Sequence, residues 1–214
     1  MNVAAIVLAA GASTRMGRAK QLLPFRGSTL VRAVAEAALA STASRVLVVL
    51  GANAERVAAA LEGLRVETVP HDGWRHGLGS SLAAGVRAAR ETRPDAVLLV
   101  LGDQPFVTAG CLDRLIAAHR GGAPLAAAER DGVVGAPALF SSAYFDTLAA
   151  LDTDDGARAV LLSHAAELAA VPMPEAAFDV DTEADRVFLL AQENETRVTK
   201  SERSRPGTQP RRRR

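Results

Sequence analysis

The sequence predicts a single-domain α/β protein with a mainly parallel sheet between two layers of helices. Short, almost purely aliphatic runs recur along the chain and end at Gly or Pro, as expected of strands buried on both faces. Segments of helical periodicity alternate with these runs, which favours parallel strands joined by crossover helices. The length of 214 residues suits one sizeable core, and no repeat or long linker divides it.

The first half of the chain carries the regular alternation. Each expected helix follows residues that can cap its first turn, as Ser, Thr and Asn often do. The expected strands are residues 3–10, 45–50, 65–69 and 96–101. The expected helices are residues 30–40 after Ser28 and Thr29, 53–62 from Asn53, and 80–90 from Ser80 and Ser81.

The second half departs from this alternation. Thr108 is expected to cap a helix that runs to His119, and Asp131-Gly132 is a hairpin signal. The last expected helix is capped by Thr182 and ends near Gln192. The remaining expected elements are hairpin strands 125–130 and 133–140, short helices from Ser141 and from Asp154 or Asp155, and a strand at 178–181.

Composition excludes several classes of protein. The single cysteine, Cys111, excludes an internal disulfide and a cysteine-rich zinc site. No apolar stretch reaches the roughly 18 residues that a membrane-spanning helix needs, and no basic segment precedes the first apolar run. We therefore expect a cytoplasmic, soluble protein without a membrane partner.

The net charge of +1 conceals a strongly basic end. Residues 196–214 hold eight Lys or Arg and one acid, which leaves 17 cations and 23 acids, a net charge of −6, in residues 1–195. This basic segment has almost no apolar content, so we expect a folded domain over residues 1–194 and a disordered tail over 195–214. A nucleic-acid-binding arm is the alternative, but the acidic body offers no basic face to extend it.

The loop after the first strand has the composition of a phosphate-binding turn. Residues 11–20 hold two glycines, two hydroxyl side chains, three cations and no acid, which favours an anion held by backbone N–H groups and cations. We expect a nucleoside triphosphate there; an ordinary turn with solvated cations is the alternative. The spacing of Gly11, Gly17 and Lys20 fits neither the dinucleotide fingerprint nor the P-loop.

Carboxylates lie just after one expected strand and within another. Asp103 comes directly after strand 96–101, at the edge where open α/β sheets bind ligands, and Mg²⁺ is its natural partner beside a triphosphate. Asp179 and Asp181 are spaced so that both point the same way in an extended strand. The alternatives are a turn aspartate at 103 and helix caps at 179 and 182.

Residues 8–20, Leu-Ala-Ala-Gly-Ala-Ser-Thr-Arg-Met-Gly-Arg-Ala-Lys, and the continuation Gln-Leu-Leu-Pro resemble the signature of a known family. It is the molybdenum cofactor cytidylyltransferase family, within the MobA-like NTP transferase superfamily. Gly102-Asp103-Gln104-Pro105 resembles the metal-binding strand end of its cytidylyltransferase branch. The resemblance implies a Rossmann-like three-layer sandwich of the GT-A-like nucleotidyltransferase fold, with the domain at residues 1–194.

The resemblance also implies roles for individual residues. Arg15, Lys20 and Asp103 would be catalytic, and Asp103 and Asp181 would bind Mg²⁺. Glu183-Ala184-Asp185 replaces the family's usual Pro-Glu-Asp, and Ala136 is apolar where many relatives are polar. The implied nucleotide-binding residues are Leu8, Ala9, Ala10, Gly11, Arg15, Lys20, Gly79, Ser80 and Ser81. The implied acceptor-binding residues are Gly135, Pro137 and Arg158.

The implied reaction is transfer of CMP from CTP to the phosphate of molybdopterin, with release of pyrophosphate. Ala10 stands where the guanylyl branch usually has glycine, and one methyl group in a tight pocket disfavours a purine by about 1–3 kcal/mol. Molybdopterin and the molybdenum hydroxylase that receives the cofactor are the implied partners. The alternatives are GTP, a sugar phosphate or methylerythritol phosphate acceptor, or a non-catalytic cofactor carrier.

Trp74 and its flanking histidines, His71 and His76, could form a metal or base-stacking group. For an isolated tryptophan in an alanine-rich chain, partial packing in the core is the favoured interpretation. We therefore expect no histidine metal site.

Overall fold

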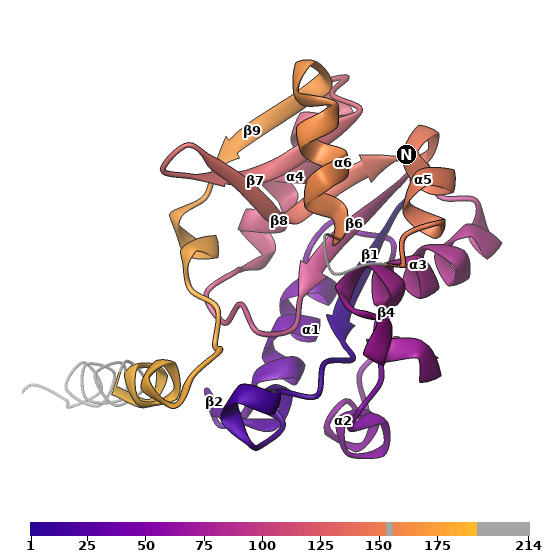
Figure 1. Cartoon of the computed structure of the whole chain (residues 1–214). Helices are drawn as coiled ribbons and strands as arrows, with labels where there is room; N and C mark the ends of the chain where they lie inside the picture. Colours follow the sequence, from indigo (N-terminus) through magenta and orange to yellow (C-terminus); the bar gives the residue numbers. More distant parts are fainter. Residues whose placement is uncertain (153–155, 192–214) are drawn as a thin grey trace, which may run out of the picture.

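The computed structural model describes residues 1–152 and 156–191 (Figure 1). Asp154 and Asp155, expected to start a helix, and the expected basic tail lie outside the described residues. None of the described helices is long and apolar enough to cross a membrane.

One mixed sheet forms the centre of the described chain, with the strand order β5-β4-β1-β6-β8-β7-β9. Its first four members are parallel, and β8 pairs antiparallel with both β6 and β7. β9 returns parallel to β7 at the edge. The strands are β1 (Val3–Ala9), β4 (Arg45–Leu50), β5 (Glu67–Pro70), β6 (Ala96–Leu101), β7 (Leu125–Arg130), β8 (Val133–Ser141) and β9 (Leu168–Pro172).

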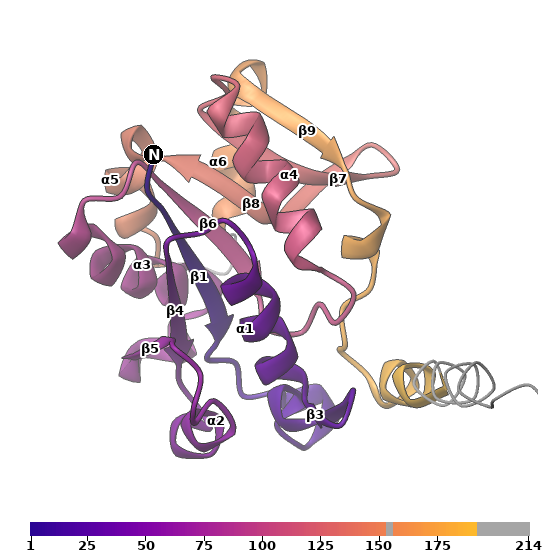
Figure 2. The ribbon, with the colours of Figure 1, turned by 180° about the vertical axis from the view of Figure 1, so that it is seen from behind.

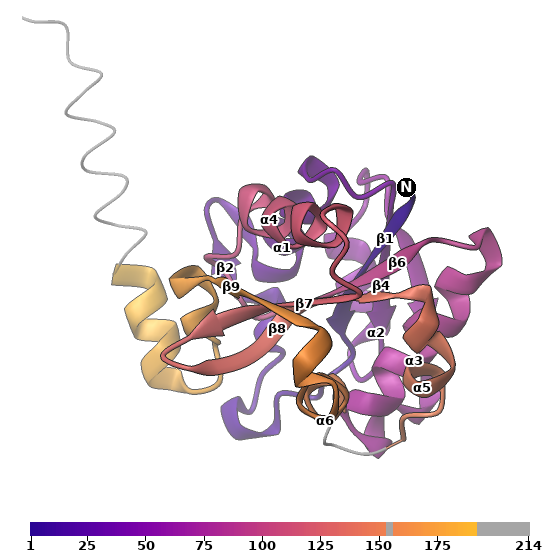
Figure 3. The same cartoon turned by 90° about the horizontal axis from the view of Figure 1, so that it is seen from above.

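Helices cover both faces of the sheet (Figures 2 and 3). In β1, Ala5 and Val7 belong to the buried cluster on one face of the sheet, and Ala4 and Ile6 to the cluster on the other. Successive side chains of a strand point to opposite faces, so both faces of this strand are apolar and need a covering layer. The helices packed on the first face are α1 (Leu30–Ala40), α2 (Ala54–Ala60) and α4 (Ala109–Arg120). Those on the second are α3 (Leu78–Ala89), α5 (Phe145–Ala149) and α6 (Gly156–Ser163). The three-layer α/β prediction is confirmed.

Short elements connect these layers. A helix at residues 183–191 closes the described chain, and its Leu189 packs with Phe25 and Leu30 in a third, smaller cluster. The two-stranded pair is β2 (Pro24–Phe25) and β3 (Ser28–Thr29). The 3-10 helices are η1 (Thr14–Met16), η2 (Lys20–Leu22), η3 (Asp72–His76), η4 (Arg90–Thr92), η5 (Ser142–Tyr144), η6 (Ala165–Glu167) and η7 (Pro174–Ala177).

Two of the predicted helix caps are confirmed. The Thr108 hydroxyl accepts a hydrogen bond from the backbone N–H of Cys111 at the start of α4. At the last helix, the Thr182 hydroxyl accepts from the Asp185 N–H while the Asp185 carboxylate accepts from the Thr182 N–H. This reciprocal pair is a capping box, in which each side chain satisfies a free backbone donor.

The starts of α1 and α2 are confirmed, whereas that of α3 is wrong. α1 and α2 begin directly after Thr29 and Asn53, as predicted, although neither side chain makes a capping hydrogen bond. α3 begins at Leu78, with Gly77 as its N-cap, so Ser80 and Ser81 lie inside the first turn. Their hydroxyls donate to the Gly77 carbonyl, because a serine within a helix can bond back to the preceding turn.

The predicted strand at 178–181 is wrong. β6 already pairs with β1 and β8 along its two edges, so the segment finds no free strand edge beside Asp103. A backbone hydrogen bond of 3.1 Å, from the Val180 N–H to the Asp103 carbonyl, helps to hold it there. The strand that the prediction missed is β9, whose Leu168-Ala169-Ala170-Val171 run was its sequence signal.

Candidate active site

The carboxyl ends of β1 and β6 lie side by side, because Leu8 pairs with Leu101 in parallel register. The loop after β1 and the turn after β6 therefore meet at one edge of the sheet, where α/β folds place ligands. A cleft of about 500 Å³ opens there. Its walls come from these two loops, from the η3–α3 segment, and from residues 179 and 181.

Lys20 joins the two carboxylates that the sequence proposed as metal ligands. Its Nζ lies 2.5 Å from Oδ2 of Asp103 and 2.8 Å from Oδ1 of Asp181. A guanidinium nitrogen of Arg15 lies 3.5 Å from the other oxygen of Asp181. The fold thus brings Lys20 into contact with Asp103, which is 83 positions further along the chain, and with Asp181, which is 161 positions further.

The burial of this cluster strengthens its electrostatics. The side chains of Lys20 and Asp103 are only 18% and 16% exposed, so solvent screens their attraction weakly. Burial by itself would lower the pKa of Lys20, but attraction and hydrogen bonds to Asp103 and Asp181 outweigh it and raise this pKa above its ordinary value. Lys20 therefore stays a cation at neutral pH.

Asp179, for which the sequence also allows a helix cap, is a residue of the cleft. It lines the cleft, and burial together with the nearby negative charge of Asp103 raises the pKa of its carboxyl group. One buried oxygen of Asp179 and one of Asp103 have no hydrogen-bond partner among the described residues. Carboxylate oxygens left in this state favour a cationic ligand in the cleft.

The opposite wall of the cleft is less charged. Trp74, Leu78 and Ser81 line it, and the guanidinium of Arg75 lies 4.3 Å from the centre of the Trp74 ring. Trp74 is half-buried against the core, as expected, but it also faces the cleft. Its position five residues before Gly79, on the same segment as the expected nucleotide-binding residues Gly79, Ser80 and Ser81, was the signal available in the sequence.

Close packing around Gly51 fixes this wall. A Cβ atom on Gly51 would lie 2.5 Å from the Ala10 carbonyl oxygen and 2.7 Å from the Trp74 Cβ. Both distances are well below van der Waals contact, so only glycine lets the end of β4 fit between the loop after β1 and Trp74. Ala10 also lines the cleft, and its Cβ atom would lie 2.8 Å from the same Cβ on Gly51.

The cleft contains most, but not all, of the expected nucleotide-binding residues. Ala9 and Gly79 are buried behind the cleft wall, and Ser80 turns away from it to accept or donate hydrogen bonds with His71, Gly73 and Gly77. The expected residues that line the cleft are Leu8, Ala10, Gly11, Arg15, Lys20, Ser81, Asp103 and Asp181.

The expected acceptor-binding residues lie apart from the cleft lining. Gly135 and Pro137 belong to β8, and Gly135 lines a separate hollow of about 20 Å³ with Arg130 and Ala136. Arg158 is an exposed residue of α6.

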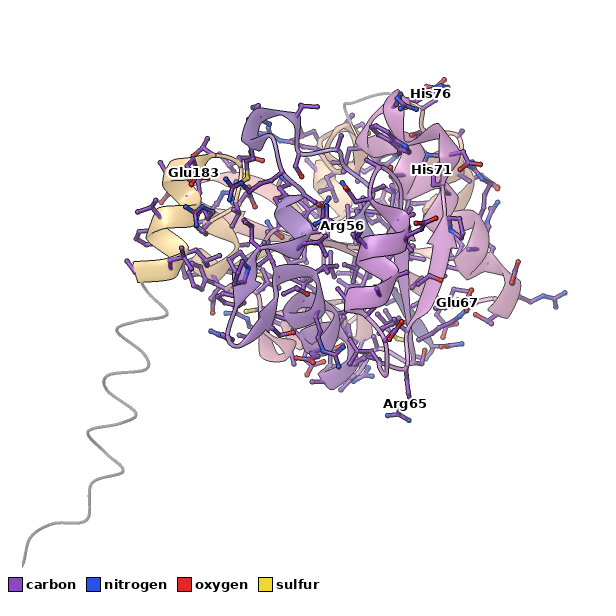
Figure 4. The ribbon with its side chains drawn as sticks, turned by 90° about the horizontal axis from the view of Figure 1, so that it is seen from below. Arg56, Arg65, Glu67, His71, His76 and Glu183 are labelled. Carbon is purple, nitrogen blue, oxygen red and sulfur yellow. The ribbon has the colours of Figure 1, made fainter. Side chains whose placement is uncertain are left out.

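The described residues 1–152 and 156–191 contain no group of three or more His, Cys, Asp or Glu side chains arranged to hold a metal ion. Figure 4 shows His71 and His76 together on one side of the molecule, far from Glu183. Asp103 and Asp181 nevertheless fit a divalent cation, because both already contact a single cationic atom. Mg²⁺ is commonly bound by one or two carboxylates, with water and substrate phosphates completing its coordination.

The chain is similar in sequence to proteins whose names describe different roles. It is 45% identical over 123 residues to nicotine blue oxidoreductase of Paenarthrobacter nicotinovorans, covering 56% of this chain and 58% of that protein. It is 32% identical over 169 residues to the purine catabolism protein PucB of Bacillus subtilis, covering 74% and 80% of the two chains. The chain thus spans little more than half the length of the Paenarthrobacter protein.

Solved structures share the whole fold. Rv0371c of Mycobacterium tuberculosis superposes with a TM-score of 0.79 at 31% identity, over 89% of this chain and 98% of that one. A structure of Rv0371c in complex with manganese gives a TM-score of 0.75 at 30% identity, over 89% and 99% of the two chains. Residues 5–168 match the MobA-like NTP transferase domain, so the chain belongs to that family.

Proposed function

We propose that this protein transfers CMP from CTP to the phosphate of molybdopterin and releases pyrophosphate. One observation carries the proposal: Lys20 of the glycine-containing loop meets Asp103 and Asp181 in the cleft beside Ala10 and Gly11. This cluster combines cations for a polyphosphate with carboxylates for its metal ion. Membership of the MobA-like NTP transferase family supports a nucleotidyl transfer.

The chain's main task in this reaction is to neutralise and position two anions. A triphosphate and an acceptor phosphate repel one another, so aligned cations lower the barrier by bringing them together. Arg15 and Lys20 would contact the triphosphate, and the N–H groups of the loop after β1 would add uncharged donors. Lys20 can do so as a cation throughout the neutral pH range, because its pKa is raised.

Asp103 and Asp181 would hold Mg²⁺. When bound, this ion would polarise the α-phosphate and stabilise charge on the leaving pyrophosphate. The manganese complex of Rv0371c supports a divalent cation in a protein of this fold.

The proposed reaction needs no strong general base. A phosphate monoester has a second pKa of about 6 and is mostly a dianion at neutral pH, so its oxygen is already a nucleophile. Among the described residues, the cleft accordingly holds an ammonium–carboxylate cluster rather than a Ser-His or Cys-His pair.

The walls of the cleft support a pyrimidine nucleotide. Ala10 lines the cleft, and both its carbonyl and its Cβ atom are packed closely against Gly51, so Ala10 has little room to withdraw from a larger base. The acceptor would approach from the β8 and α6 side, where Gly135, Pro137 and Arg158 are found.

Pyrophosphate release with CTP, GTP, ATP and UTP in turn, with Mg²⁺ and molybdenum-loaded molybdopterin, tests the proposal. We expect release with CTP to exceed release with each other nucleotide, and to require the pterin. Release with GTP, or with a sugar phosphate or methylerythritol phosphate as acceptor, would establish a related transferase instead.

Binding of the pterin without any pyrophosphate release would point to a cofactor carrier. A protein that shares the activity named for its Paenarthrobacter relative would likewise release no pyrophosphate. Asp103→Asn serves as the inactive control in every arm.

A further inference from the structure

Two buried glutamines each follow a charged residue of the cleft, Gln21 after Lys20 and Gln104 after Asp103. We propose that both are positioning residues. They hold the loop that carries Lys20 and the segment that carries Asp181 at fixed positions relative to Asp103. The inference rests on the proposed function for the ligands that this cluster receives. The geometry on which it stands is independent of any particular nucleotide.

Gln21 fastens the loop after β1 to the strand that it leaves. Its side chain is 3% exposed, and its Nε2 donates to the carbonyls of Ala9 at 3.2 Å and Gly11 at 2.7 Å. The hydroxyl of Ser13 bonds to the Gln21 Oε1 at 3.4 Å and accepts from the Lys20 N–H at 3.1 Å. One carboxamide thus ties both ends of the loop together.

Gln104 fastens the segment that carries Asp179 and Asp181. Its side chain is 1% exposed, and its Nε2 donates to the carbonyl of Ala136 on β8 at 3.2 Å and that of Ala176 in η7 at 3.5 Å. Together with the bond from the Val180 N–H to the Asp103 carbonyl, this holds the segment against the end of β6. Asp181 can reach Lys20 only while the segment stays there.

The chemistry of these glutamines argues against a purely stabilising role. A buried carboxamide is unfavourable unless its donors and acceptors are satisfied, and the Gln104 Oε1 is buried with no hydrogen-bond partner among the described residues. A methionine of similar length would fill the same space without that penalty. What it could not do is hold two backbone carbonyls at fixed positions, as each glutamine does.

The two glutamines should therefore act on different ligands. Gln21 orders the loop that carries Lys20, so its loss should weaken nucleotide binding. Gln104 orders the segment that carries Asp181, so its loss should weaken divalent-cation binding. A role in stability alone would give no such division.

Gln21→Met and Gln104→Met test this division on the full chain. Mn²⁺ binding is measured by electron paramagnetic resonance without nucleotide, and CTP binding by calorimetry without metal. Gln104→Met should weaken Mn²⁺ binding about tenfold or more, as loss of a group that supports metal ligands does. Gln21→Met should weaken CTP binding about tenfold while leaving its Mn²⁺ affinity within about twofold of the wild type.

Leu115→Ala is the matched control, because Leu115 is fully buried on α4 in the core. It should lower the melting temperature and leave both affinities unchanged. If the glutamine variants likewise change the melting temperature alone, or weaken both ligands equally, the inference is wrong.

Amide hydrogen exchange tests the inference independently of the proposed function. Exchange should accelerate over residues 11–20 in Gln21→Met and over residues 176–181 in Gln104→Met. Unchanged exchange in these segments would overturn the inference. A wild-type protein that binds neither CTP nor Mn²⁺ would overturn the proposed function, while the exchange pattern would still decide whether the glutamines position these segments.

Discussion

Lys20 and Lys200 are the only lysines among the 25 basic residues of the sequence. Lysine differs from arginine in presenting a compact charge rather than a planar fork. At position 20 this compact charge fits between Asp103 and Asp181 with both contacts at 2.8 Å or less. Removing it would leave two nearby carboxylates without their shared cation.

Lys20→Ala and Asp103→Asn should each reduce turnover by about a hundredfold or more, the effect expected when a charge-stabilising group is lost. Steady-state pyrophosphate release at saturating CTP checks this. An effect of about tenfold or less would contradict the roles given to these residues.

The raised pKa of Lys20 also predicts how stability depends on pH. Because the folded pKa lies above the unfolded one, the ion pairs contribute fully below the unfolded value of about 10.4 and are lost as pH rises through the folded value. The melting temperature of the wild type should therefore exceed that of Lys20→Met by a constant amount from pH 7 to 9. This difference should shrink above about pH 10.5, and a difference that grows with pH would refute the assignment.

Ala10 sets the predicted preference for a pyrimidine. Ala10→Gly removes the methyl group of a residue that lines the cleft. The kcat/KM for GTP relative to that for CTP should therefore rise by about 10- to 200-fold, the range for one methyl group in a tight pocket. Competition between the two nucleotides in one reaction measures the ratio. An unchanged ratio would show that the base lies elsewhere.

At the scale of elements, the buried strands were predictable because their evidence is local. The apolar run of β1 and its alternation between two clusters need no information beyond the run itself. The position of Asp103 beside the loop of Lys20 was also predictable, since the carboxyl ends of parallel strands share one edge of the sheet.

The elements that were not predictable depend on what they pack against. The segment 178–181 has the composition of a strand, but β6 offers it no free edge. Gln21 and Gln104 look like ordinary polar positions in the sequence, and only the folded chain shows that they are buried. The sequence leaves open whether Asp179 is a helix cap or a residue of the site, because its burial near Asp103 depends on tertiary contacts.

The cap of α4 gives a prediction at this scale. Thr108→Ala removes the hydroxyl that accepts from the Cys111 N–H, which should lower the free energy of unfolding by about 1 kcal/mol. Urea denaturation measures this. Turnover should not change, because Thr108 lies outside the lining of the cleft, and a loss of turnover without a loss of stability would contradict this separation.

At the scale of the whole molecule, three distant segments build one site. The loop after β1 supplies Lys20, the end of β6 supplies Asp103, and the segment after η7 supplies Asp181. The parallel strands bring the first two together, and β8 with β9 carries the chain back to deliver the third (Figure 1). The proposed reaction requires all three around one metal-bound triphosphate.

A crystal structure with Mn²⁺ and a non-hydrolysable CTP analogue tests this requirement most directly, because manganese is located by its anomalous scattering. The account predicts one manganese peak in contact with both Asp103 and Asp181, and the triphosphate on the loop of Arg15 and Lys20. Manganese bound away from both carboxylates, or a nucleotide outside the cleft, would contradict it.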